Sequence, residues 1–533
     1  MGWLGSAVDR VLGRAPLVPL SAYGGGAFYE GASLGRRFAT MSAPASGPNT
    51  AILASGKTLA DRTEALDRNE GFLRSGLEVL TIGVIGTGVM PRCEVKDAKL
   101  QEAAHELWDR HMAEADADSV TDGYGMQALG VRAAFVGGDA LYRKRPRFAD
   151  DRPLYMPAPF AVPVQYQLLE AAMLPRDKNE ALTGGGKIIG GVEFGPFGNR
   201  VAYHMYREHP SELARFSGGF GSTELSRVPA ENIFHLREVR RPGQVRGEPR
   251  CAATVLPAHD FHQGEDALQK SWNLQAVLSA FIEISDYDVA TTSGWMPILT
   301  PAEQAAARQA NTGTAQATLE PGDIPVLRPG QSIKPFSPPD VGATYETAQK
   351  LRLRRMSAAL GVPYELLSKD LENVSYSSAR IGLINFWAGC DALLWHTLVP
   401  QVLWPMWVTF FDTAVRAGRL PVRLSDYLAE PWKYLAVSWI PPKRPWVDPL
   451  KDAQGEILAI ESGLTSRDES ILSRGGIPER VDQSRKQSQD RADALGVRDA
   501  KAEGAATTTA GPRQTPPAVA DEPQSDAERR AAA

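Results

Sequence analysis

Residues Leu360–Arg380 read LGVPYELLSKDLENVSYSSAR, and this stretch decides the fold. Gly361 and Pro363 predict the end of a helix, because glycine adopts the left-handed conformation that closes many helices and proline cannot continue one. Ser375 or Ser377 predicts the cap of a new helix, since a serine side chain accepts a hydrogen bond from a free backbone N–H. The residues between are mostly polar. The sequence therefore predicts a helix, a polar loop and a second helix.

The apolar run Ile381–Val415 follows the loop and predicts a long helix that holds the loop in place. Its central part, Phe386–Phe411, is long enough to suggest a membrane span. Asp391, Pro400 and Pro405 interrupt this part, and an aspartate inside a membrane is costly. The pattern favours a buried helix kinked at its prolines. A membrane-associated interaction protein stays as an alternative.

Composition sets wide bounds on the fold. A chain of 533 residues is too long for one compact core and is expected to divide into about three or four modules. A hydrophobic content of 43% and a charged content of 23% are typical of a soluble globular protein. Cys93, Cys251 and Cys390 lie far apart without metal-ligand spacing. We therefore expect free thiols in a reducing compartment, with no metal and no cofactor.

The net charge of −5 bears on nucleic-acid binding. A protein that grips DNA usually carries a basic surplus, because lysine and arginine displace counterions from phosphates. This chain has no such surplus overall. If it handles DNA, it is better suited to letting DNA pass than to holding it.

The first half of the chain mixes helical and strand periodicity. Residues 1–55 are rich in glycine, alanine, serine and proline and predict a flexible arm. Helical spacing dominates Leu59–Leu80 and Asp97–Ala115. The pattern of Thr121–Phe148 predicts a helix and then a strand, and apolar and polar residues alternate within Val162–His235 as they do in strands. Four cations gather at the end of the third of these segments: Arg143, Lys144, Arg145 and Arg147. The predicted class is α+β.

The second half predicts a projecting pair of helices and then a helical end. An apolar stripe from about His259 to Ile282 indicates one helix, and Tyr345–Leu360 indicates its partner. The segment Thr291–Pro339 between them is crowded with glycine and proline. Helical patterns return in three short stretches after residue 452, and the residues beyond Gly504 are too poor in large apolar side chains to pack.

Several stretches, in order along the chain, closely resemble the lambda family of bacteriophage portal proteins. The most specific is Arg241–Gly247, which reads RPGQVRG, and the opening Leu360–Arg380 stretch resembles the family's signature. The other stretches are LDRN (66–69), VIGTGV (84–89), GVE (191–193), GNRVAYH (198–204), LEPG (319–322), LRPGQ (327–331), WI (439–440) and DPLK (448–451). The resemblance covers roughly residues 25 to 485, which is more than a single motif could explain.

The resemblance implies a portal fold with an α/β wing, a two-helix stem, a small β-rich clip, a long central helix and a helical crown. The implied divisions are an arm (1–55), wing (56–255), first stem helix (256–290), clip (291–340), second stem helix (341–362), tunnel loop (363–378), long helix with the remaining wing (379–448), crown (449–500) and disordered tail (501–533).

The resemblance also implies a function. Portal proteins form a ring of about twelve copies at one capsid vertex, since heterologous contacts that close give a ring. Double-stranded DNA passes through the ring without sequence-specific binding. The expected partners are the terminase large subunit, a head–tail connector, and the major capsid and scaffold proteins. The expected location is the virion, after assembly in the bacterial cytoplasm, and no enzymatic activity or membrane is expected.

Two groups of residues are the predicted sites. In the tunnel loop, Lys369, Asp370, Glu372, Asn373 and Tyr376 are expected to meet DNA without reading its bases, and an exposed connector is the simpler alternative.

On the first stem helix, acidic residues are expected to face the channel and repel phosphates: Asp260, Glu265, Asp266 and Glu283. On the second, Arg352, Arg354 and Arg355 are expected to pair with the acidic helix of a neighbouring subunit. Ordinary solvated helix faces are the alternative.

An enzyme acting on DNA is the second rival class. Residues 183–187 read TGGGK, but Ile188 stands where a phosphate loop has serine or threonine, and the glycine spacing is wrong. His259 and His262 lie near acidic residues without a further ligand at metal spacing. Neither pattern predicts a catalytic site.

Overall fold

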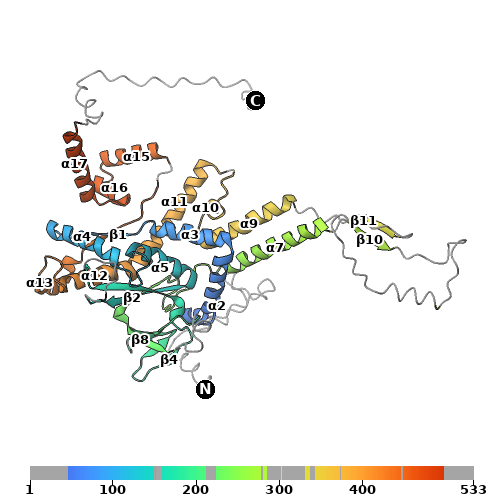
Figure 1. The fold of residues 1–533 in the computed structure, drawn as a ribbon, viewed down its shortest axis with the longest axis horizontal. Coiled ribbons are helices and arrows are strands. Elements are labelled where there is room, and N and C mark those ends of the chain that lie inside the picture. Colours follow the sequence, from blue (N-terminus) through green and yellow to red (C-terminus); the bar gives the residue numbers. More distant parts are fainter. Residues whose placement is uncertain are drawn as a thin grey trace, which may run out of the picture.

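The computed structural model describes residues 46–148, 151, 159–211, 224–277, 280–284, 302, 331–335, 342–372, 374–445 and 448–496. Within them, helices and antiparallel strands are mixed, which confirms the predicted α+β class. Figure 1 shows a body from which one pair of helices projects. We call the described residues within 46–254 and 374–445 the body. Most of the predicted arm and clip, Asn373 and the predicted tail lie outside the described residues.

The body begins with helices α2 (Pro48–Asn69) and α3 (Gly71–Ile85). Glu70 separates them with an extended backbone, and its carboxylate accepts hydrogen bonds from two backbone N–H groups of α3. This cap satisfies donors that have no partner inside the helix. The helical spacing of Leu59–Leu80 is therefore confirmed, as two helices rather than an unbroken one, and α2 begins at Pro48, before the predicted end of the arm at residue 55.

A three-stranded antiparallel sheet in the order β3-β2-β9 forms the centre of the body. It lies against α5, and it follows two helices whose N-terminal caps are the aspartates Asp97 and Asp122. These elements lie where the periodicity predicts them: α4 (Ala98–Glu114), α5 (Gly123–Gly137), β2 (Asp139–Pro146), β3 (Val164–Glu170) and β9 (Ile233–Arg237).

A five-stranded antiparallel meander lies beside the first sheet, in the order β4-β5-β6-β7-β8. Tyr203, Met205 and Val228 of this meander pack on Leu141 of β2 in a small separate core. The strands and the short 3-10 turns are β4 (Glu180–Ala181), β5 (Lys187–Ile189), β6 (Val192–Phe194), β7 (Arg200–Tyr206), β8 (Leu225–Pro229), η5 (Ala171–Met173) and η6 (Ala230–Asn232). The TGGGK stretch is the turn between β4 and β5, not a phosphate loop.

The long apolar run is helical throughout, as α11 (Tyr376–Leu393), η7 (Leu394–Leu403) and α12 (Trp404–Arg416). The middle segment is a π-helix that contains Pro400, whose missing N–H removes a hydrogen bond from the ladder. Trp407, Phe410 and Phe411 are fully buried, so this run belongs to the core. In the part of the chain that the structure describes, no helix is long and apolar enough to span a membrane.

The body is completed by short elements that pack around this helix. Strand β1 pairs antiparallel with β12, so the pairing joins the two sequence segments of the body. The elements are β1 (Met90–Cys93), α13 (Leu424–Ala429), α14 (Pro431–Tyr434) and β12 (Val437–Ile440).

The projecting pair consists of α7 (Val255–Val277) and α9 (Gly342–Leu360), with β10 (Ala280–Ile284) and β11 (Gln331–Pro335) paired beyond them (Figure 1). The second helix lies where the sequence predicts it. The first was predicted to reach residue 290, which is wrong: it ends at Val277, and residues 280–284 form a strand. Glu283 is therefore on a strand rather than on a helix face.

Three helices follow the body: α15 (Pro449–Glu461), α16 (Arg467–Ser473) and α17 (Pro478–Ala494). They confirm the helices that the sequence predicts there. Ser466 and Glu469 form a capping box at the start of α16. Ion pairs from Arg92 to Glu479 and from Asp109 to Arg480 fasten α17 to the body.

Candidate functional site

The predicted loop begins where α9 closes. Gly361 has a φ of 76°, the left-handed conformation that glycine favours, and its N–H donates to the carbonyl of Ser357. A short helix, α10 (Tyr364–Ser368), follows, which the sequence did not predict. Lys369 then ends α10 with a φ of 60°, a conformation that is uncommon outside glycine. The exposed loop thus starts at a residue with a left-handed backbone conformation.

Asp370 organises the loop. Its carboxylate accepts a hydrogen bond of 3.0 Å from the backbone N–H of Glu372 and another of 3.0 Å from the hydroxyl of Tyr364. These bonds, and then the nearby Lys350, lower the pKa of Asp370. Asp370 is therefore a structural anchor, whereas Lys369 and Glu372 point their charges at solvent. Asn373 lies outside the described residues.

The loop ends at the start of α11. The side chain of Ser375 accepts from the backbone N–H of Ser378, so Ser375 is the cap and Ser377 is not. Tyr376 is the first residue of the helix, and 51% of it is exposed. Capping explains the serines of this stretch without any ligand.

The loop is tied to the projecting helix α9. Lys350 on α9 lies 3.9 Å from Asp370, and the guanidinium of Arg354 lies over the ring of Tyr364, 5.4 Å from its centroid. Three of the five predicted loop residues, Lys369, Asp370 and Glu372, therefore sit together at the base of the projecting pair. The sequence does not show these contacts, because they join α9 to α10 and to the loop that follows it.

The acidic residues predicted on α7 have different surroundings. Asp260 and Asp266 are exposed, and neither forms an ion pair with another described residue. Glu265 instead accepts hydrogen bonds from Tyr345 and Gln349 of α9. It links the two helices of one chain, which is a different role from the predicted free channel charge.

The arginines predicted on α9 are exposed. None of Arg352, Arg354 and Arg355 has a carboxylate partner among the described residues. The guanidinium of Arg352 lies close over Gly264 of α7, where a side chain would clash with it. These cations are thus available to charges outside the chain.

Sequence reasoning missed a buried charge cluster around Asp139. Arg246, with no exposed surface, donates from Nε to Asp139 at 2.8 Å and from its other nitrogens to the carbonyls of Leu174, Gly190 and Ala171. The backbone N–H of Gly247 donates to the second Asp139 oxygen. The RPGQVRG stretch therefore joins the two sheets and η5.

His235 completes the cluster, with its Nε2 atom 2.9 Å from Asp139. Burial lowers the pKa of His235 to about 3, so the ring is neutral at pH 7. Burial alone raises the pKa of Asp139, but Arg246, His235 and Arg176 outweigh it and hold that pKa well below its usual range. The cluster is fully buried, so it is a structural tie and not a channel surface.

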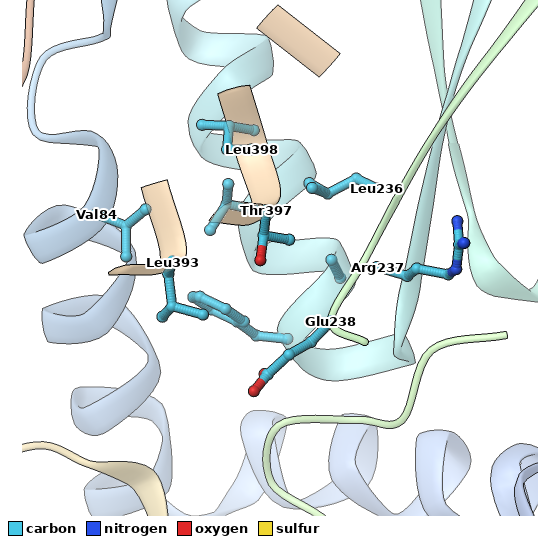
Figure 2. A pocket seen from close by; sticks show the side chains of 10 residues that line it. Val84, Leu236, Arg237, Glu238, Leu393, Thr397 and Leu398 are labelled. Atoms are coloured by element: carbon cyan, nitrogen blue, oxygen red, sulfur yellow. The ribbon is translucent and has the colours of Figure 1, made fainter. Parts of the chain in front are cut away.

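Two cavities among the described residues differ in size and in lining. Figure 2 shows a cavity of about 30 Å³ between α3, α5, β9 and η7, lined mainly by apolar side chains such as Val84, Leu393 and Leu398. Ligand pockets usually enclose about 300–1,000 Å³. An open groove of about 960 Å³ between α2 and α5 contains Asp61 and Glu64. Burial and the nearby Glu170 raise the pKa of Glu64. Among the described residues, no group of three or more His, Cys, Asp or Glu is placed to hold a metal ion.

Comparison with known protein families decides what this architecture is. Residues 34–393 match the family described as "Phage portal protein, lambda family". The chain belongs to the lambda family of phage portal proteins. The match covers more than half of the chain and includes the body up to residue 393, the projecting helices and the loop.

Individual portal proteins show the same relationship. A probable portal protein of Halomonas phage phiHAP-1 is 25% identical over 312 residues, which are 58% of this chain and 56% of that protein. Portal protein B of Escherichia phage lambda is 25% identical over 260 residues, 46% of this chain and 47% of the relative. The chain spans about half the length of these relatives.

Comparison with solved structures found the neck of a native GTA particle, with a TM-score of 0.41 and 14% identity over 81% of this chain and 99% of that chain. An HK97-family phage portal protein from Corynebacterium diphtheriae has a TM-score of 0.28 and 11% identity over 74% of this chain and 98% of that chain.

Proposed function

We propose that this chain forms a portal ring at one vertex of a phage or prophage capsid, through which a separate motor drives double-stranded DNA. The match of residues 34–393 to the portal family carries the proposal. The proposed partners are the terminase large subunit, a head–tail connector, and the major capsid and scaffold proteins. The ring is a virion component assembled in the host cytoplasm, and it supplies a passage rather than a catalytic site.

The geometry of the described residues supports this function. The pair α7 and α9 projects from the body as a stem would (Figure 1). Helix α10, which the loop follows from Lys369 on, packs against α9. Heterologous contacts between copies close into a ring when the rotation per copy divides a full turn. We assign α7 and α9 to the stem, the loop to the channel, and α15 to α17 to the crown.

The stem charges favour contacts between copies. Asp260 and Asp266 on α7, and Arg354 and Arg355 on α9, have no ion-pair partner among the described residues. In a closed ring, α7 of one subunit comes next to α9 of the neighbour, so opposite charges meet. Each exposed pair contributes little alone, about 0.2–1 kcal/mol, but every interface of the ring repeats it.

Electron microscopy of the purified full chain, together with its mass in solution, tests the proposal. We expect closed rings with a central hole wide enough for a DNA duplex. The variant Arg354→Glu/Arg355→Glu is expected to shift the mass distribution from rings toward single chains, because attraction at each interface becomes repulsion.

Two further variants complete this experiment. Adding Asp260→Arg/Asp266→Arg to the stem variant should restore the rings, since the charges are then exchanged. Arg416→Glu/Lys433→Glu reverses two exposed cations of the body and serves as the matched control. Normal rings from the stem variant would refute the pairing. A single chain that hydrolyses ATP or cuts DNA would refute the portal function.

The loop is proposed to touch passing DNA without reading its bases. Lys369→Ala/Asn373→Ala removes one charge and one amide while Asp370 keeps its anchoring bonds. We expect fewer DNA-filled particles in a packaging assay, measured as nuclease-protected DNA per particle, with rings still formed. Lys433→Ala on the body is the control. Unchanged packaging would remove both loop side chains from the mechanism.

A further inference from the structure

A strip of arginines on β2 has no role in the proposed channel. Arg143 and Arg145 occupy alternate positions of β2, and Arg147 continues the ladder through its N–H, which donates to Pro163 at 3.0 Å. Alternate residues of a strand share one face and are about 6.8 Å apart. The three guanidinium groups therefore form one evenly spaced row, which we call the arginine strip. Strand β2, which carries the strip, lies in the body and not in the projecting pair of stem helices (Figure 1).

Neutral amides orient two of the three arginines in the strip. Arg145 donates to the Gln167 side-chain oxygen, and Arg147 donates from Nε to the Gln165 side-chain oxygen at 2.7 Å. Gln165 is itself buried and donates to two backbone carbonyls, so its orientation is fixed. The guanidinium groups of Arg145 and Arg147 are thus oriented by neutral amides, which do not compensate their positive charge.

No carboxylate neutralises the strip within the described residues. None of its arginines forms an ion pair there, and the exposed Asp118 contacts the amide of Gln167 at 3.5 Å rather than a guanidinium. Burial and the adjacent Arg145 lower the pKa of Arg143, which is the expected result of crowding cations without an anion. Lys144 is on the opposite face, where Glu231 and Asp412 act on it. The chain has a net charge of −5, so this row of positive charges contrasts with its overall acidity.

We propose that the arginine strip binds the phosphate backbone of duplex DNA outside the channel, without regard to base sequence. This inference rests on the proposed function, which places the chain beside packaged DNA. Arginine holds a phosphate through two parallel N–H bonds, and the even spacing of the row matches a polymer with regularly repeated anions. An acidic protein surface carries carboxylates at irregular intervals, so it fits the row less well.

The test uses the purified full chain and a fluorescent, covalently closed DNA circle, which cannot thread a closed ring. Binding is measured between 50 and 200 mM salt. At a slope of about 0.9 per phosphate contact, three contacts contribute about 2.7 to the salt dependence, or about 40-fold in affinity across this range. Changing Arg143, Arg145 and Arg147 to glutamine should remove this contribution. Changing Arg74, Arg207 and Arg416, three exposed and carboxylate-paired arginines, to glutamine should not.

Further measurements make the outcome decisive. Replacing the same three arginines by lysine keeps the charge and should keep the salt slope while weakening affinity several-fold, because the bidentate geometry is lost. A glutamine variant that melts like the natural chain and keeps its full salt slope would overturn the inference. So would polyglutamate that binds the strip more tightly than the DNA circle, which would identify an acidic protein as the partner. Rings that ignore the circle would refute only the strip, whereas the absence of rings with circle binding intact would refute only the portal function.

Discussion

Asp139→Asn should lower the free energy of unfolding of the body by about 3–5 kcal/mol, which is the usual cost of removing one partner from a buried ion pair. The variant keeps the size of the side chain but leaves the Arg246 guanidinium, which has no exposed surface, without its counter-charge. It also weakens the bonds to His235 and to the N–H of Gly247. Chemical denaturation followed by tryptophan fluorescence measures the change.

A matched variant separates burial from charge loss in this experiment. Asp67 pairs with Arg132 at 2.8 Å, but both side chains are partly exposed. Asp67→Asn should therefore lower the free energy of unfolding by about 1 kcal/mol or less. Equal losses of unfolding free energy in the two variants would show that the buried cluster stabilises the body no more than the partly exposed Asp67–Arg132 pair does. A smaller loss in Arg246→Met/Asp139→Leu than in Asp139→Asn would support the unpaired charge as the cause.

Local signals in the sequence predicted much of the fold. Gly361, Ser375 and Asp97 mark helix ends through bonds within a few residues, and each lies where its chemistry requires. The strand at Ala280–Ile284 was missed because its apolar residues fit a helix as well as a strand. It is fixed by pairing with Gln331–Pro335, about fifty residues later, which periodicity does not reveal.

The candidate site was predictable only in part. The polar loop around Lys369 follows from the sequence, whereas its attachment to α9 through Lys350 and Arg354 depends on packing between helices. The role of Arg246 was harder to see. Its stretch was the most specific point of resemblance to the portal family, yet its partner Asp139 is 107 residues away. A residue in a stretch typical of the family can therefore have a structural role rather than a functional one.

Acidification from about pH 6.5 to pH 4 should destabilise the body steeply, because two buried histidines must take up protons. Burial lowers the pKa of His111 to about 4 and that of His235 to about 3. A base whose pKa is lowered by folding adds stability that is complete above the unfolded pKa of about 6.5 and is lost as the pH falls. For His111 this loss reaches about 3 kcal/mol at pH 4, at 1.36 kcal/mol per pH unit.

His111→Phe tests this explanation. The ring of His111 packs against Trp108, Tyr166 and Phe410, and its Nε2 atom has no hydrogen-bond partner among the described residues. Phenylalanine therefore fits the same aromatic surroundings without a group that titrates. The free energy of unfolding of this variant should fall less between pH 6.5 and 4 than that of the natural chain. The same change at the exposed His396 should leave the pH dependence as it was. If His111→Phe loses stability as steeply as the natural chain, the acid sensitivity comes from other groups. The buried His235, whose pKa is also lowered by burial, is then the next to test.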